Sequence, residues 1–145
     1  MKEIIILVGP PASGKTTMCK NEFKDYTRVN QDERLNTHWK KLIECGEPKL
    51  IVDRMNHIKS QREGYLKFAK EHGYHTKMIC LDVPYEVCLA RAVKRKDHPT
   101  IKDRVTAKRA LGGYFKEIQV PDLNEADDIK FLSYDPKNEI STSHQ

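Results

Sequence analysis

The sequence predicts an α/β protein, a three-layer α/β/α sandwich in which helices cover both faces of a parallel sheet of about five strands. Short apolar runs rich in β-branched residues alternate with longer helix-like stretches along the chain, and this alternation implies right-handed crossovers between parallel strands. The first apolar run leads directly into a glycine-containing turn and then a helix-like stretch. Folds of this class bind phosphate at such a turn.

Five segments are candidate strands, and the patterns at 26–30 and 129–133 are weaker than the other three. Ile4–Val8 is apolar throughout, as expected of a central strand buried on both faces, and the others span 26–30, 49–52, 76–81 and 129–133. The helices expected between and after them span 15–23, 33–45, 58–72, 84–96 and 101–118. Gly73 stands at the usual C-terminal cap position of the third helix, and Pro84 suits the first turn of the fourth.

Length and composition narrow the class of protein. The 145 residues favour one domain, and the formal net charge of +5, with basic residues crowded between Arg91 and Arg109, favours an anionic partner. No run of about twenty apolar residues occurs, so we expect a soluble, cytoplasmic protein with no membrane partner. The four cysteines form no C-x-x-C pair, which argues against a zinc site and against a disulfide framework.

The stretch GPPASGKTT matches the pattern G-x-x-x-x-G-K-[ST] between a predicted strand and a predicted helix. Its glycines let backbone N–H groups turn toward phosphate oxygens, and the helix N-terminus adds its dipole. We expect Lys15 to bridge the β- and γ-phosphates of a nucleoside triphosphate, Thr16 to hold Mg²⁺ and Thr17 to touch the α-phosphate. The full nucleotide-binding set in this loop is Gly9, Pro10, Pro11, Ala12, Ser13, Gly14, Lys15, Thr16 and Thr17.

Carboxylates follow the next two candidate strands, at the edge of the sheet where open α/β folds bind ligands. Asp32 could accept the proton of an attacking hydroxyl, or it could cap the helix that follows. Asp53, which ends the third strand and is followed by Asn56, could hold a metal through water or orient an arginine. Helix capping is again the alternative for Asp53 and Asn56.

A basic segment follows the fourth helix. Arg91 and Arg95 lie four residues apart and share one helix face, and an arginine on a lid could stabilise the charge of a γ-phosphoryl group in transfer. We include Arg91 in the nucleotide-binding set and place the lid at about 91–113. Neither an N-K-x-D nor a D-x-x-G motif of switch GTPases occurs. The pattern therefore favours a P-loop kinase-like phosphotransferase.

From about Lys2 to Ser133 the sequence resembles the polynucleotide 5′-hydroxyl kinases, whose pattern is matched by GPPASGKTT, VNQD, VDRMN, FAKEHGY and LDVPYEVCLARAVKR. The resemblance implies transfer of the γ-phosphate of ATP, or of another nucleoside triphosphate, to the 5′-hydroxyl of DNA or RNA. It also implies that Asp32 is the general base, Arg95 the transition-state arginine and Asp53 the acidic residue ending the third strand. Residues 1–134 would form the kinase domain and 135–145 a polar tail.

Two departures from the family pattern stand out. The family's phage enzyme grips the acceptor phosphate with an arginine three residues after the base, where this chain has Leu35, so Arg34 is the substitute candidate for binding substrate. No D-x-D-G-T phosphatase motif occurs, so we expect kinase chemistry alone. The alternatives are a small-molecule kinase acting on a nucleoside, sugar or antibiotic hydroxyl, and a nucleic-acid-binding or regulatory module that binds nucleoside triphosphate without transferring phosphate.

Overall fold

A computed structural model describes residues 1–30, 38–94 and 101–136. The elements, in chain order, are β1 (Glu3–Val8), α1 (Lys15–Asn21), β2 (Thr27–Asn30), α2 (His38–Glu44), β3 (Lys49–Asp53), α3 (Lys59–Glu71), β4 (His75–Asp82), α4 (Tyr85–Lys94), α5 (Ile101–Glu117) and β5 (Asp128–Ser133). All the expected strands and helices are present. The expected helices 33–45 and 84–96 extend into stretches outside the described residues, where their outer ends are not assigned.

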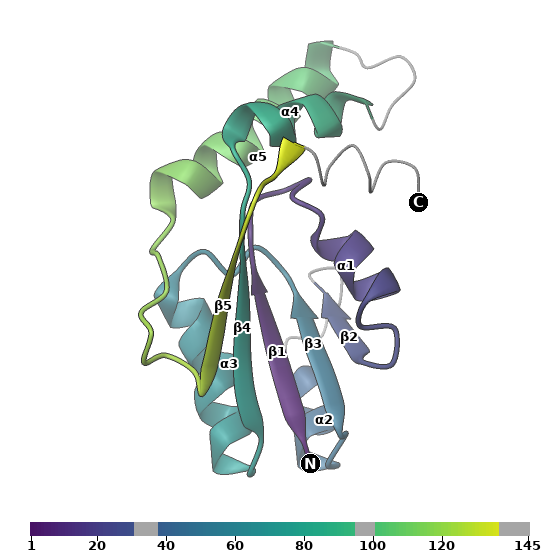
Figure 1. Cartoon of the computed structure of the whole chain (residues 1–145), viewed down its shortest axis with the longest axis vertical. Coiled ribbons are helices and arrows are strands. Elements are labelled where there is room, and N and C mark those ends of the chain that lie inside the picture. Colours follow the sequence, from purple (N-terminus) through teal and green to yellow (C-terminus); the bar gives the residue numbers. More distant parts are fainter. Residues whose placement is uncertain (31–37, 95–100, 137–145) are drawn as a thin grey trace.

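The strands form one five-stranded sheet in the order β2-β3-β1-β4-β5, with every pairing parallel. Figure 1 shows the strands side by side with their carboxyl ends pointing the same way. After β1 the chain moves to one side of it to build β2 and β3, and then to the other side to build β4 and β5. This reversal places the topological switch point at the carboxyl end of β1, where ligands of such sheets bind.

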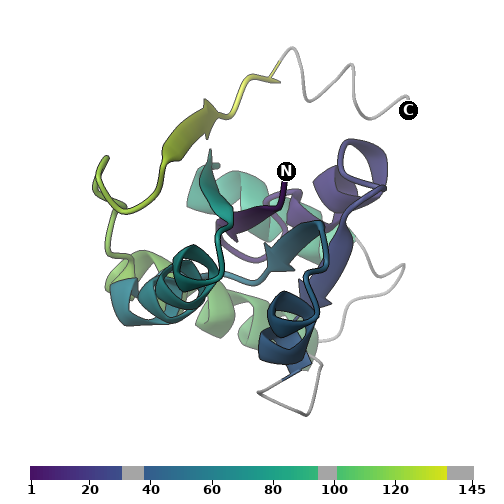
Figure 2. The same cartoon turned by 90° about the horizontal axis from the view of Figure 1, so that it is seen from below.

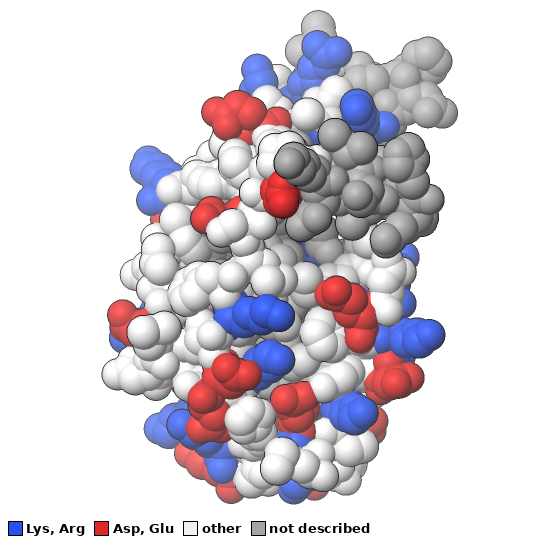
Figure 3. Space-filling model, in the orientation of Figure 1, with Lys and Arg blue, Asp and Glu red and all other residues white. Residues whose placement is uncertain are grey.

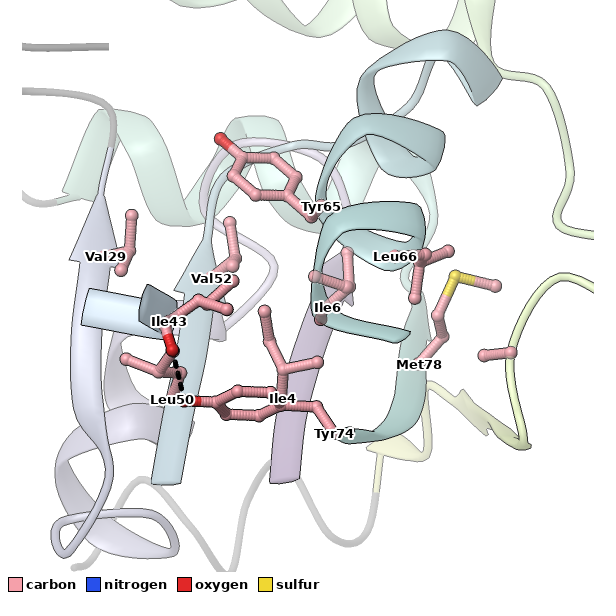
Figure 4. Packing of buried hydrophobic residues seen from close by; sticks show 12 residues of the cluster. Ile4, Ile6, Val29, Ile43, Leu50, Val52, Tyr65, Leu66, Tyr74 and Met78 are labelled. Carbon is pink, nitrogen blue, oxygen red and sulfur yellow. Dashed lines mark hydrogen bonds between the residues drawn. The ribbon is translucent and has the colours of Figure 1, made fainter. Parts of the chain in front are cut away.

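Helices lie on both faces of the sheet, which confirms the three-layer fold. One face packs against α2 and α3 through the cluster drawn in Figure 4, which contains Ile4, Ile6, Leu50 and Val52 from the strands and Leu66 from α3. The other face packs against α1 and α4 through residues that alternate with these, including Ile5, Leu7 and Ile51. Figure 2 shows α1 and α3 on opposite sides of the strands. The alternation follows from the two-residue period of a strand.

Helix α3 ends as its sequence predicts. Gly73 has a positive φ of 81°, which a residue without Cβ adopts without strain. Its N–H donates to the Lys70 carbonyl at 3.0 Å, and the Tyr74 N–H reaches back to the Ala69 carbonyl at 3.0 Å. These bonds satisfy carbonyls at the helix end and direct the chain into β4.

A buried ion pair joins α3 to the segment before β5. Arg62 is fully buried, and its Nε and Nη2 donate to the two carboxylate oxygens of Glu125 at 2.9 and 3.2 Å. Its Nη1 donates to the backbone carbonyl of Asn56 at 2.9 Å. The guanidinium therefore fixes three segments at once, namely α3, the loop after β3 and the connection into β5.

The cysteines are all free thiols, and Cys19, Cys80 and Cys88 are buried while Cys45 is exposed. Burial raises the pKa of Cys19 and of Cys80 to about 11, so both stay protonated at neutral pH and contribute to the core. Within the described ranges no helix is both long and apolar enough to cross a bilayer. The same ranges contain no group of three or more His, Cys, Asp or Glu side chains that could hold a metal ion.

We predict that Arg62→Ala lowers the free energy of unfolding by about 3–5 kcal/mol, because it leaves the Glu125 carboxylate buried without its cation. Urea denaturation followed by circular dichroism measures this change. The double variant Arg62→Met/Glu125→Leu, which removes both charges, should recover most of the loss. A change of less than about 1 kcal/mol in the single variant would contradict a structural role for the pair.

Candidate active site

The loop after β1 curls at the switch point through two residues with positive φ. Ala12 has φ 62° and Gly14 has φ 104°, and Gly14 is the N-terminal cap residue of α1. A Cβ on Gly9 would lie 2.8 Å from Ser13 Oγ and 3.2 Å from Leu81 Cβ, so a side chain there would displace these neighbours. The backbone thus forms a tight turn that ends at a helix N-terminus, as a phosphate-binding loop requires.

The Lys15 ammonium lies inside this turn. Lys15 is buried, and its Nζ donates to the carbonyls of Gly9 at 2.9 Å and Pro10 at 2.7 Å and approaches Ser13 Oγ at 3.5 Å. The loop therefore holds a cation surrounded by its own acceptors. This is the position from which a lysine reaches the β- and γ-phosphates of a nucleotide in the loop.

Thr16, Arg28 and Asp53 meet beside the loop. The Thr16 hydroxyl donates to Asp53 Oδ2 at 3.2 Å, and Arg28 Nε donates to the same oxygen at 2.7 Å. The Asp53 side chain is only 3% exposed, while that of Arg28 is 36% exposed. Asp53 thus pairs with an arginine and a hydroxyl, and it does not cap a helix. The two oxygen ligands, Thr16 Oγ1 and the Asp53 carboxylate, are of the hard type that Mg²⁺ prefers.

Asn56 connects the end of β3 to the end of β1. It has a left-handed φ of 49°, and its Nδ2 donates to the Leu7 carbonyl at 2.7 Å. The neighbouring Met55 carbonyl accepts the Gly9 N–H at 3.1 Å. Because the N-terminal cap residue of α3 is Ile58, Asn56 does not act as the cap that its residue type allows. Its contacts instead fix the entry of the phosphate loop.

A cleft of about 390 Å³ lies at the carboxyl ends of the strands, and Lys15, Thr16, Arg28 and Asp53 are among the residues that line it. The phosphate loop contributes Pro11, Ala12, Gly14, Lys15 and Thr16, while the two strand ends and helix α5 contribute Arg28, Asn30, Asp53, Arg54, Met55 and Ala110. The chain therefore brings its loop and the ends of β2 and β3 to one surface.

Helices α4 and α5 lie across the carboxyl end of the sheet (Figure 1). On the face drawn in Figure 3, the described Lys and Arg side chains near this end are separated from one another and form no continuous patch. Arg91 of α4 reaches the phosphate loop, since its Nη1 donates to the Ala12 carbonyl at 3.1 Å. Its guanidinium also lies over the Tyr134 ring at 5.8 Å. Arg91, which the sequence analysis included in the nucleotide-binding set, is thus hydrogen-bonded to the phosphate loop.

Three of the predicted site residues, Asp32, Arg34 and Arg95, lie outside the described residues. Of the others, the predicted residues that line the cleft are Pro11, Ala12, Gly14, Lys15, Thr16 and Asp53. The described lining does not include Gly9, Pro10, Ser13, Thr17 or Arg91, and Asn56 contacts the end of β1 instead. Sequence reasoning missed Arg28 and Arg54, which also line the cleft. A signal for Arg28 was its place two residues before the carboxyl end of a predicted strand, and Arg54 follows Asp53 directly.

The sequence matches a known protein family. Residues 33–112, more than half of the chain, match the family model described as an AAA domain. The chain belongs to this family. The matched segment begins after the phosphate loop, so the loop supports the assignment independently.

Three curated relatives are similar to the chain. The bifunctional polynucleotide phosphatase/kinase of Schizosaccharomyces pombe is 28% identical over 86% of the chain and 31% of its own length. A putative enzyme of the same description from Acanthamoeba polyphaga mimivirus is 32% identical over 59% of the chain and 22% of its own length. Transcription factor bHLH140 of Arabidopsis thaliana is 24% identical over 84% of the chain and 15% of its own length. The chain thus spans less than a third of each of these relatives.

Solved structures show the same fold at low identity. A fungal RNA kinase has a TM-score of 0.66 at 15% identity, covering 90% of this chain and 73% of the other. A sugar kinase from Janibacter sp. HTCC2649 has a TM-score of 0.62 at 15% identity, with coverage of 99% and 92%. Kti12 of Chaetomium thermophilum with ADP-AlF3 has a TM-score of 0.60 at 14% identity, with coverage of 97% and 94%. The fold is that of P-loop kinases, and the relatives support the family resemblance.

We predict that Lys15→Met weakens ATP binding about ten- to a hundredfold, because charge-assisted hydrogen bonds to the phosphates are lost. Isothermal titration calorimetry with ATP measures the affinity. Lys20→Met, on the exposed side of the same helix, is the control and should bind ATP as the unaltered protein does. Equal affinities for the two variants would remove Lys15 from the nucleotide site.

Proposed function

We propose that this protein is a polynucleotide 5′-hydroxyl kinase, which transfers the γ-phosphate of ATP or another nucleoside triphosphate to the 5′-hydroxyl of DNA or RNA. The observation that carries the proposal is the shared cleft, because a phosphate loop and the ends of β2 and β3 line one space. Its described lining holds the cations Lys15, Arg28 and Arg54 against one carboxylate, Asp53. This excess of positive charge suits a donor and an acceptor that both carry phosphate.

On the donor side, the loop N–H groups and the Lys15 ammonium would bind the β- and γ-phosphates, and Thr17 the α-phosphate. Mg²⁺ would be held by the Thr16 hydroxyl and, through water, by Asp53, and it would neutralise charge on the β- and γ-oxygens. Arg91, attached to the loop at Ala12, would add a cation on the lid side.

In the transfer step, the 5′-hydroxyl oxygen forms a bond to the γ-phosphorus while the bond from that phosphorus to the β–γ bridging oxygen breaks, and the nucleoside diphosphate leaves. In this proposal Asp32 accepts the hydroxyl proton. Arg95 stabilises the negative charge on the equatorial oxygens of the transferring group. The kinase domain would span residues 1–134 with the lid at about 91–113. Arg34 would lie on the substrate side, whereas Asn56 would act through the loop entry that its contacts fix.

The acceptor assignment rests on the sequence resemblance, which extends over most of the chain, and on the relatives named as polynucleotide kinases. The sugar kinase neighbour shares only the fold at 15% identity, and a small-molecule acceptor is the competing assignment. Contacts from arginine and lysine to a nucleic-acid backbone would bind strands with little sequence preference.

A direct assay separates the two assignments. We expect labelled phosphate from ATP to appear on the 5′ end of 5′-OH DNA or RNA oligonucleotides, measured by gel electrophoresis after incubation with Mg²⁺. A panel of free nucleosides, nucleoside 3′-phosphates and sugars, each offered with the four nucleoside triphosphates, is run beside them. Labelling of a nucleoside or a sugar with no labelling of any oligonucleotide would overturn the polynucleotide assignment.

Substitution of the residues assigned to phosphate transfer should slow turnover without weakening ATP binding. We predict that Asp32→Asn lowers turnover by about 10²–10⁴ and that Arg95→Ala lowers it by about 10³–10⁵, while both variants bind ATP with unchanged affinity. Single-turnover kinetics and calorimetry measure the two quantities. A protein that only binds nucleotide would show no loss in Asp32→Asn, and a loss below about tenfold in Arg95→Ala would remove that arginine from the chemistry.

A further inference from the structure

Arg54 is the first residue after β3, and it lines the cleft beside the phosphate loop. Its Nη1 donates to the Tyr65 hydroxyl at 2.8 Å. Tyr65 is itself held, because it is 5% exposed and its ring lies 4.6 Å from that of Trp39. Figure 4 shows the Tyr65 hydroxyl pointing away from the rest of the core cluster. The arginine is thus anchored from behind by a rigid aromatic residue.

The two arginines of the cleft differ in their electrostatic partners. Arg28 donates to the Asp53 carboxylate at 2.7 Å, so its charge is largely compensated. Arg54 donates to a neutral hydroxyl, and within residues 1–30, 38–94 and 101–136 it forms no ion pair. A guanidinium keeps several N–H donors after one is used. Within these ranges Arg54 therefore carries a positive charge that no carboxylate pairs with, and it keeps N–H donors for a further contact.

The direction of the Arg54 side chain separates it from the donor loop. Leu50 and Val52 face the α2–α3 side of the sheet, and Arg54 continues this row by its contact with Tyr65 of α3. Asp53 faces the other side, where it meets Thr16 of α1. Arg54 and the residues expected to bind the donor therefore lie on opposite faces of the sheet edge. This arrangement favours the acceptor, and not the donor, as the partner of Arg54.

We propose that Arg54 binds a phosphate of the acceptor strand and so positions the 5′-hydroxyl nucleotide, an inference that rests on the proposed function. An arginine whose fork is oriented by a hydroxyl is suited to bidentate contact with a phosphate. Arg54 would make this contact from the carboxyl end of β3.

The test uses Arg54→Gln, which removes the charge but keeps an amide donor for the Tyr65 hydroxyl. The 5′-OH acceptors compared are a nucleoside and the same nucleoside carrying a 3′-phosphate. We expect the KM for the 3′-phosphate to rise about ten- to a hundredfold and the preference for it over the nucleoside to disappear, while the KM for ATP stays unchanged. Lys67→Ala is the control, because it removes an equal charge from the exposed surface of α3. It should leave unchanged the KM for the 3′-phosphate, the preference for it over the nucleoside and the KM for ATP.

A second variant checks the anchor. Tyr65→Phe keeps the Arg54 charge but removes the hydroxyl, and we expect a smaller rise in the same KM with no change for ATP. Melting temperatures of all variants show whether the fold is kept. If Arg54→Gln raises the KM for ATP and for the acceptor equally, Arg54 belongs to the donor site and the inference is wrong.

Binding measured without turnover keeps this inference distinct from the proposed function. Fluorescence anisotropy with a 5′-OH tetranucleotide labelled at its 3′ end should show weaker binding to Arg54→Gln and a shallower dependence of affinity on salt. An active protein whose Arg54→Gln variant keeps the 3′-phosphate preference overturns the role of Arg54 alone. A protein that phosphorylates no oligonucleotide overturns the proposed function, and equal tetranucleotide affinities then overturn the role of Arg54 as well.

Discussion

The candidate site depends on the way Asn56 holds the end of β1. Its side chain donates to the Leu7 carbonyl, and the adjacent Met55 carbonyl accepts the Gly9 N–H. These two bonds fix the direction in which the chain leaves β1 and enters the phosphate loop. Asn56 makes this contact in a left-handed conformation, and its own carbonyl accepts a hydrogen bond from the buried guanidinium of Arg62. The loop is therefore positioned from beneath by polar contacts and not by apolar packing alone.

Strand alternation distributes the functional side chains around that fixed loop. Asp53 points to the side of α1, where it accepts from Thr16 and from Arg28. Arg54 points to the side of α3, where it donates to Tyr65. The consecutive residues Asp53 and Arg54 at the end of β3 thus place side chains on both sides of the cleft. The parallel sheet makes this possible because the carboxyl ends of β2 and β3 lie next to each other in register, with Asn30 opposite Asp53.

The strands, helices and phosphate loop could be predicted from the sequence because their signals are local: apolar runs, the cap at Gly73 and the spacing of Gly9 and Lys15. Contact of Asp53 with an arginine was one of its predicted roles, but the sequence did not choose it over helix capping, and it did not indicate the contact of Asn56 with the Leu7 carbonyl. Helix capping and a tertiary contact both favour short polar side chains at a strand end, and only the three-dimensional arrangement separates them. The cleft-lining role of Arg54 was equally hidden, since it depends on a tyrosine in the following helix.

The arrangement of Lys15 explains why such a loop can bind a polyanion strongly without a large reorganisation. Its ammonium is already buried and bonded to the Gly9 and Pro10 carbonyls, so much of its desolvation cost is met on folding. Phosphate oxygens offer the same kind of acceptor with a full negative charge, and exchanging one for the other strengthens each bond. The Gly9 N–H is bonded to the Met55 carbonyl, so a phosphate that enters the loop meets a backbone that the fold has already positioned.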